Sequence, residues 1–121
     1  MSFPANGWDL GAFMLDGQRY DVEATAITVA GGVTTELAVG QPGKVIRVVY
    51  AWFGAAAAAW RFKSASSSLG PQIVVAANAT PPNWPPAPKW VETAAGEALS
   101  IQNLSGSGAG TIAVGWVVLP A

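Results

Sequence analysis

Hydrophobic and polar residues alternate with a period of two along most of the chain, and this pattern predicts β-strands. The clearest case is residues 90–101. Val91 and Thr93 suit an extended strand because β-branched side chains pack well on a pleated surface. Gly96 can then take a positive φ angle in a tight turn, and Leu99 opens a second run of alternating residues. We therefore expect a strand, a tight turn and a second strand here.

Residues 44–53 form the most hydrophobic predicted strand, with apolar side chains on both faces. Simple alternation places one set of side chains on one face, namely Ile46, Val48, Tyr50 and Trp52. It places the other set on the opposite face, namely Val45, Arg47, Val49, Ala51 and Phe53. A strand that is apolar on both sides is covered on both sides. We expect one face to line the core and the other to meet a neighbouring subunit.

Further strands are predicted at residues 20–29, 33–39, 72–77 and 111–119, and around Trp60 and Phe62. The phase of the alternation changes within 20–29, which indicates either a bulge or a strand with two covered faces. The five alanines at 55–59 are expected to form a loop that leads into a strand, with a short helical turn as the alternative. Residues 64–71 are expected to form a polar loop. About eight strands without a long helix predict an all-β sandwich or barrel.

Two segments lack a clear strand pattern. Residues 78–89 hold five prolines and Trp84, which predicts an extended surface loop. Residues 1–19 mix glycine, proline and aromatic residues, including Trp8 and Phe13. This N-terminal segment either covers the sheet of its own domain or acts as an arm that docks on a neighbour. We expect it to precede a single β-sandwich domain at 20–121.

Composition narrows the possible functions. The chain has 121 residues, no Cys and no His, and only 11% charged residues with a formal net charge of −1. It therefore has neither a disulfide framework nor the basic patch that binds a nucleic-acid backbone. No segment has the pattern of a secretory signal or the roughly 20 apolar residues of a membrane helix, so we expect a soluble protein made in the cytoplasm. So few charges also favour burial of apolar surface between subunits.

Candidate catalytic or metal-binding residues are sparse. Glu92 and Glu97 could form a carboxylate pair, but ion pairs with strand arginines or lysines explain them better. Four acidic residues near the N-terminus lack the spacing of a calcium loop, namely Asp9, Asp16, Asp21 and Glu23. The serines at 66–68 have no His partner, and the glycine-rich run at 105–110 has no Lys for phosphate binding. We predict neither an enzyme nor a cofactor or metal site.

Six tryptophans are many for this length. Trp52, Trp60 and Trp116 lie in predicted strands and are expected to pack in the core or between subunits. Trp84 is different because it lies in the proline-rich loop. It is a candidate for a docking contact, a sugar platform or a cover for its own sheet.

Two stretches resemble a known family. One is Gly43-Lys44-Val45-Ile46-Arg47-Val48 with the later Trp60-Arg61-Phe62-Lys63-Ser64, and the other is residues 90–99, with Glu-Thr-Ala-Ala-Gly-Glu-Ala-Leu at its centre. Together they resemble small bacteriophage virion proteins of the capsid decoration or cement type, which also occur as distal modules of phage fibres and tailspikes. The similarity spans roughly residues 33–119 of this chain. The resemblance implies a jelly-roll β-sandwich that assembles as a homotrimer.

The same resemblance implies a role on the exterior of the phage capsid. Trimers would bind the major capsid protein and stabilise the shell, whereas neither nucleic acid nor a membrane is an expected partner. The alternative is a receptor- or glycan-binding module at a fibre or tailspike tip. The proline-rich loop and the aromatic N-terminal segment depart from the family pattern. We therefore expect Trp8, Phe13 and Trp84 to contact the partner.

Overall fold

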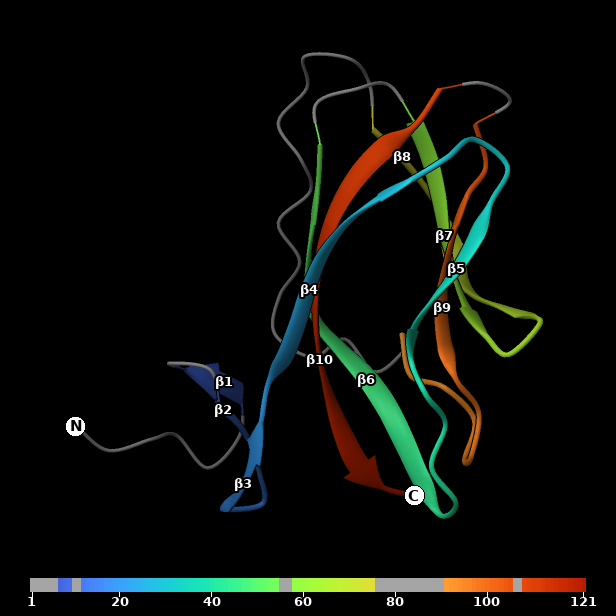
Figure 1. The fold of residues 1–121 in the computed structure, drawn as a ribbon. Coiled ribbons are helices and arrows are strands. Elements are labelled where there is room, and N and C mark those ends of the chain that lie inside the picture. The colour runs from blue at the N-terminus through green and yellow to red at the C-terminus, as the bar shows by residue number, and fades with distance from the viewer. Residues whose placement is uncertain (1–6, 10–11, 55–57, 76–90, 106–107) are drawn as a thin grey trace.

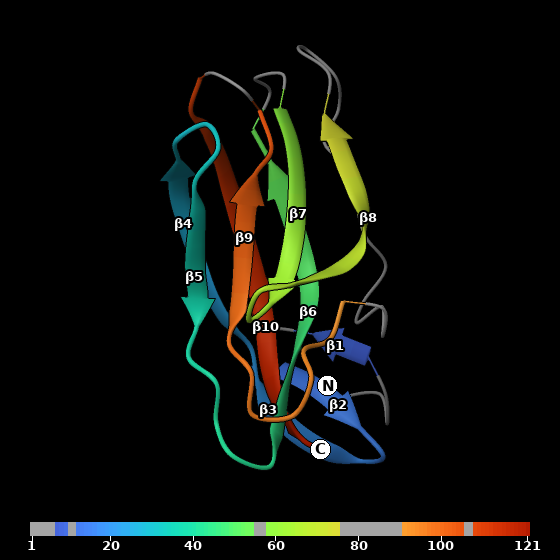
Figure 2. The same ribbon diagram turned by 90° about the vertical axis from the view of Figure 1, so that its right-hand side faces the viewer.

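The computed structural model describes residues 7–9, 12–54, 58–75, 91–105 and 108–121. These residues form ten β-strands and no helix, which confirms the all-β prediction. Seven strand pairings among the described residues, all antiparallel, define three sheets with strand orders β1-β2-β3, β4-β10-β6 and β5-β9-β7-β8. Figures 1 and 2 show the second and third sheets facing each other, with the small first sheet beside one end.

The N-terminal sheet consists of β1 (Gly7–Asp9), β2 (Ala12–Leu15) and β3 (Gln18–Asp21). Asp16 and Gly17 form the two-residue turn between β2 and β3, with φ angles of 51° and 78°. Two successive positive φ angles are typical of the hairpin turn that Asp-Gly sequences favour. The strand expected at 20–29 is therefore divided at Val22, and the domain boundary expected after residue 19 falls inside β3.

The two larger sheets contain β4 (Glu23–Val29), β5 (Thr34–Ala38), β6 (Lys44–Phe53), β7 (Ala58–Ser64), β8 (Ser67–Val75), β9 (Leu99–Asn103) and β10 (Gly110–Pro120). The polar loop expected at 64–71 is wrong, because β7 and β8 form a tight hairpin in which Ser64 pairs with Ser67. Ser66, Ser67 and Ser68 are exposed, whereas Ser64 is buried, and β8 is an edge strand of its sheet. An edge position also tolerates the proline at 71. Of the alanine run, Ala58 and Ala59 begin β7, and 55–57 lie outside the described residues.

Residues 91–93 add a short extended segment to the edge of β6. The amide of Val48 donates to the carbonyl of Val91 at 3.0 Å, and the amide of Thr93 donates to the carbonyl of Ile46 at 2.9 Å. The chain then turns at Gly96, whose φ of 81° confirms the predicted positive value, and enters β9 in the opposite sheet. Of the strand, turn and strand expected at 90–101, the turn and the second strand are confirmed, whereas the first is reduced to a single bridge between Glu92 and Arg47, and Trp90 lies outside the described residues. The segment links the two layers.

The strand pairs of the sandwich are nested. β4 pairs with β10, β5 with β9, β6 with residues 91–93, and β7 with β8. Along the chain, each segment of the first half of the sandwich thus pairs with a segment of the second half in reverse order, as in one long hairpin that is folded over on itself. Two further pairings, β6 with β10 and β7 with β9, join neighbouring parts of the ribbon into sheets.

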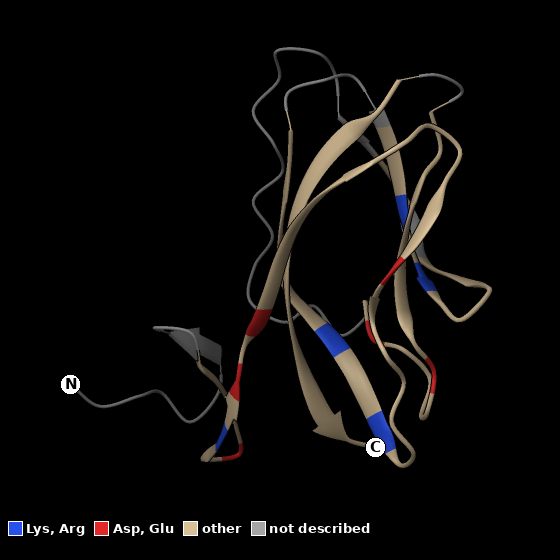
Figure 3. Ribbon diagram, in the orientation of Figure 1, with Lys and Arg blue, Asp and Glu red and all other residues tan. Residues whose placement is uncertain are grey.

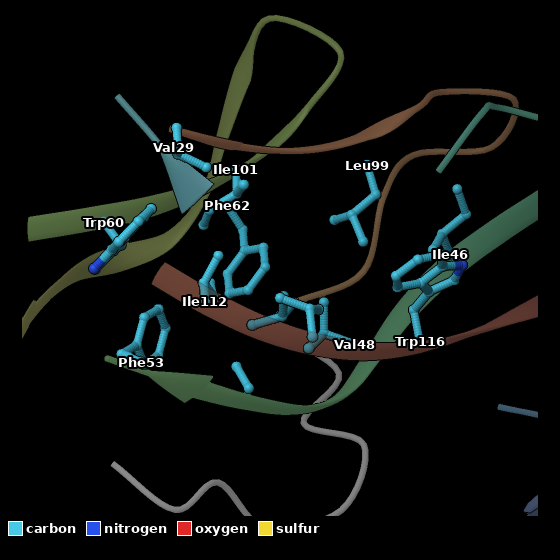
Figure 4. Close-up of a cluster of buried hydrophobic side chains, with 13 residues drawn as sticks. Val29, Ile46, Val48, Phe53, Trp60, Phe62, Leu99, Ile101, Ile112 and Trp116 are labelled. Carbon is cyan, nitrogen blue, oxygen red and sulfur yellow. The ribbon is translucent and has the colours of Figure 1, made fainter. Parts of the chain in front are cut away.

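The main core lies between these two sheets, and 13 of the described residues are buried in it. Trp60 and Phe62 of β7 meet Phe53 of β6 there, and the ring centroids of Phe53 and Trp60 are 5.9 Å apart (Figure 4). Ile112, Val114 and Trp116 of β10 also lie in this core, with Val118 packed against it. The phase predicted for 111–119 is therefore confirmed.

The predicted faces of β6 need a correction. Trp116 pairs with Val48 and Gly115 with Tyr50, so Val49 has no opposite residue and forms a bulge. Beyond the bulge the alternation is inverted. Ile46 and Val48 face the main core before it, as simple alternation predicts, but Ala51 and Phe53 face that core after it. Tyr50 and Trp52 therefore lie on the outer side of the sheet.

Candidate interaction surface

The outer face of the β4-β10-β6 sheet has two halves. The half near Val45 carries large aliphatic side chains, including Val49, Val117 and Leu119. These form a second buried cluster with Phe13 of β2, and Leu15, Tyr20 and Val22 pack against it. The N-terminal sheet therefore covers this part of its own domain, which we call the covered half. The N-terminal segment was expected either to cover the sheet of its own domain or to dock on a neighbour. The described residues 12–21 do the first.

Phe13 anchors that cover. Its side chain is only 2% exposed, and the guanidinium carbon of Arg47 lies 5.8 Å from the centre of its ring. The same guanidinium donates to Glu92 across 3.1 Å, and both side chains of this ion pair are at least four-fifths buried. A buried ion pair is costly to break because the remaining charge loses its partner away from water. Arg47 thus joins the N-terminal sheet, β6 and residues 91–93.

The other half of the outer face, which we call the open half, is built from small side chains and one large one. Its residues are Ala24, Ala26 and Thr28 on β4, Thr111, Ala113 and Gly115 on β10, and Trp52 on β6. Ala113 pairs with Ala26 on one side and with Trp52 on the other. Trp52 is 50% exposed and borders a shallow depression of about 440 Å³.

Tyr50 lies at the boundary between the two halves. It packs against the covered cluster, and its ring lies so close over Gly115 that a Cβ atom there would overlap it. A glycine opposite an aromatic residue is what allows the ring to lie flat on the sheet. The covered and open halves are therefore parts of one continuous surface.

The described residues that line the depression include no Lys, Arg, Asp or Glu. Figure 3 shows the charged residues of β6 in the part of that strand where Lys44 and Arg47 lie. Glu23 begins β4 and borders the open half next to Ala24. The hydroxyl-bearing Thr28 and Thr111, which pair across strands, are the polar side chains of this lining. The open half is therefore an apolar and uncharged surface.

The three expected contact residues have different outcomes. Phe13 is buried within its own chain, so its side chain is not exposed to a partner in this structure. The backbone of Trp8 lies in β1, opposite Phe13 of β2. Trp84 and the proline-rich loop lie outside the described residues.

Trp52 is exposed on the outer face, although the alternation pattern predicted the opposite face for it. The sequence placed it on the same face as Ile46 and Val48, and the bulge at Val49 separates them. A signal was available in the opposite strand, because an isolated glycine such as Gly115 within an apolar strand often marks a bulge. Trp60 and Trp116, by contrast, are buried in the core as expected.

The other polar candidates have structural contacts. Glu92 pairs with Arg47, and Glu97 accepts a hydrogen bond from the hydroxyl of Ser64, which itself accepts one from the amide of Ala94. These contacts tie the turn at 94–97 to the β7-β8 hairpin. Within the described ranges, no three acidic residues gather where a metal ion could bind. The described part of the chain likewise contains no helix long and apolar enough to cross a membrane.

Searches against family models, curated proteins and solved structures found no match to this chain.

Proposed function

We propose that this chain is a structural protein of a bacteriophage virion, which assembles as homotrimers and decorates the exterior of the capsid. The observation that carries the proposal is the open half with the exposed Trp52, because an uncharged apolar face is suited to contact with another protein. The role would be adhesion without chemistry. Each trimer would bridge neighbouring copies of the major capsid protein and thereby raise the force or temperature that opens the shell.

We further assign the sandwich to the jelly-roll type. The nested pairing supports this assignment, since a jelly roll consists of eight strands in two sheets joined by Greek-key connections. Counted from β4, with residues 91–93 as the sixth strand, the orders are 1-8-3-6 in one sheet and 2-7-4-5 in the other. The sequence resemblance to phage decoration proteins, many of which are expected to share this fold, supports the same assignment.

The location of the protein in the virion tests the proposal. Virions of the phage that encodes this chain would be labelled with gold-conjugated antibody and viewed by electron microscopy. We expect labels distributed over the shell, and we expect purified protein to bind shells from which it has been removed. Shells with added protein should then open at a higher temperature. Labels confined to the tail, or no binding to shells, would contradict the proposal.

One observation favours a second function, glycan or receptor binding at a fibre or tailspike tip. The depression beside Trp52 has the volume of a small-ligand site and offers the hydroxyls of Thr28 and Thr111 next to an aromatic ring. A sugar ring could stack on the indole while its hydroxyls bond to the threonines. Binding of the wild-type protein to host cells or glycans, together with labels at the tail, would favour this function.

A further inference from the structure

Four side chains that can donate hydrogen bonds lie together on the outer face of the other large sheet, β5-β9-β7-β8. Arg61 and Lys63 alternate along β7 with residues of the buried core, so they point away from it (Figure 3). Arg61 lies opposite Gln102 of β9, and Lys63 lies opposite Ser100. Such neighbours are about 4.8 Å apart across the strands and about 7 Å apart along them. We call these four residues the donor cluster.

The two cations of the donor cluster are partly buried and have no counter-charge. Arg61 and Lys63 are each only partly exposed, and buried cations are normally paired with an acid. Arg47 follows this rule, since its guanidinium bonds to Glu92 at 3.1 Å. Among the described residues, neither Arg61 nor Lys63 takes part in an ion pair, and the Nε of Arg61 is buried without a hydrogen-bond partner. Two like charges thus lie side by side without an acid between them.

The remainder of the sequence has little to neutralise this pair. The residues outside the described ranges contain no Asp or Glu. Glu92 is paired with Arg47, and Glu97 accepts its hydrogen bond from Ser64. Glu36 of β5 shares the face of the donor cluster, opposite Ser100, and forms no ion pair with Lys63. An anion from outside the chain would therefore supply the missing charge.

We propose that the donor cluster is a binding site for an oxyanion with two negative charges, of the chemical type of a phosphate group. Two cations balance two charges, whereas a carboxylate would leave one cation unbalanced. Guanidinium and ammonium groups both bond well to phosphate oxygens, and Gln102 and Ser100 add neutral donors. Glu36 beside the site lowers the affinity by repulsion. The site is independent of the proposed function, because it lies on a different sheet from the open half.

The test titrates the full chain with inorganic phosphate above neutral pH, where this ion is mainly doubly charged, and follows backbone amides by NMR at constant ionic strength. We expect saturable shifts that are largest at the four residues of the donor cluster. Arg61→Gln and Lys63→Gln should each weaken binding about tenfold or more, because each removes a charged hydrogen bond. Glu36→Gln should strengthen binding. Circular dichroism checks that each variant is folded.

Arg19→Gln is the matched control, because it removes the same charge at an exposed site on the N-terminal sheet. Its affinity for phosphate should change by less than about twofold at an ionic strength where distant charges are screened. An equal loss in Arg19→Gln and Arg61→Gln would overturn the proposal, because the effect would then reflect net charge alone.

A second titration with glucose 6-phosphate distinguishes two sources of the same group. Binding of this ester at the donor cluster would support a phosphate carried by a larger molecule, and binding of inorganic phosphate alone would support a site for the free ion. Acetate is the control for a single charge. Binding of acetate as tight as that of phosphate, or the absence of saturable shifts at the donor cluster in the wild-type chain, would overturn the proposal.

Discussion

The covered and open halves of one sheet differ in the size of their side chains. The covered half has Val49, Val117 and Leu119, and the N-terminal sheet buries them. The open half has alanine, glycine and threonine at the corresponding outward positions, with Trp52 as the single large residue. Burial stabilises by about 25 cal/mol for each Å² of apolar surface, so large side chains gain much from a cover and small ones gain little.

This difference would allow one sheet to have an intramolecular contact on one half and, under the proposed function, a contact with another protein on the other half. A half with large aliphatic side chains needs a permanent cover from its own chain. A half with small side chains can remain exposed in the isolated subunit at little cost, and a single Trp can then provide most of the affinity for a partner. The following predictions test this division.

The largest effect is expected for Phe13→Ala, which removes the centre of the cover. Phe13 is 2% exposed, and replacing a buried Phe by Ala costs about 3 kcal/mol or more. The free energy of unfolding, measured by urea denaturation, should fall by that amount. The variant should also bind more of a hydrophobic dye, because Val117 and Leu119 lose their cover. A loss below about 1 kcal/mol would mean that the N-terminal sheet contributes little to this half.

The second prediction concerns the ion pair beneath Phe13. Glu92→Ala leaves the guanidinium of Arg47 without its carboxylate at a site where both side chains are at least four-fifths buried. We expect a loss of about 2 kcal/mol in the free energy of unfolding, less than for a fully buried pair. The pair Arg19 and Asp21 is the matched control, since its side chains are 57% and 83% exposed. Asp21→Ala should therefore change stability by less than about 0.5 kcal/mol. Similar losses for the two variants would contradict the role given to Arg47.

The third prediction concerns the turn that follows residues 91–93. Gly96 has a φ of 81° and donates its amide to the carbonyl of Lys44, at the end of β6 that belongs to the covered half. Gly96→Val should cost about 1 to 2 kcal/mol, because a β-branched residue is strained at positive φ. No other atom within 4 Å would meet an added Cβ, so the cost comes from the backbone alone. Thermal unfolding tests this, and an unchanged melting temperature would contradict it.

Much of the fold could be predicted from the sequence because its strands follow the period of two. β6 begins and ends at the residues expected, and the turn at Gly96 has the expected sign of φ. The hairpin at Asp16-Gly17 was missed, although Asp-Gly is a strong hairpin signal, because aromatic residues without periodicity surround it. The serine-rich β7-β8 turn was missed because exposed strand ends have the composition of a loop.

The candidate surface could be predicted only in part. The sequence indicated correctly that β6 is apolar on both faces and that its outer face needs a cover. It left open whether the N-terminal segment covers its own sheet or docks on a neighbour, because the choice depends on the pairing of β2 and β3 and on the packing of Phe13. Nor could it place Trp52 outside the core, because the bulge at Val49 appears only when β6 is aligned with β10.

The smallest effect is expected for Trp52→Thr, and this variant is the sharpest test of the comparison. The residue it replaces is 50% exposed and lies outside both buried clusters, so the isolated subunit should lose less than about 1 kcal/mol of stability. Urea denaturation at several protein concentrations, extrapolated to high dilution, separates this quantity from any contribution of assembly. A large loss at high dilution would show that Trp52 supports its own subunit as Phe13 does, and the two halves would then not differ in the way argued.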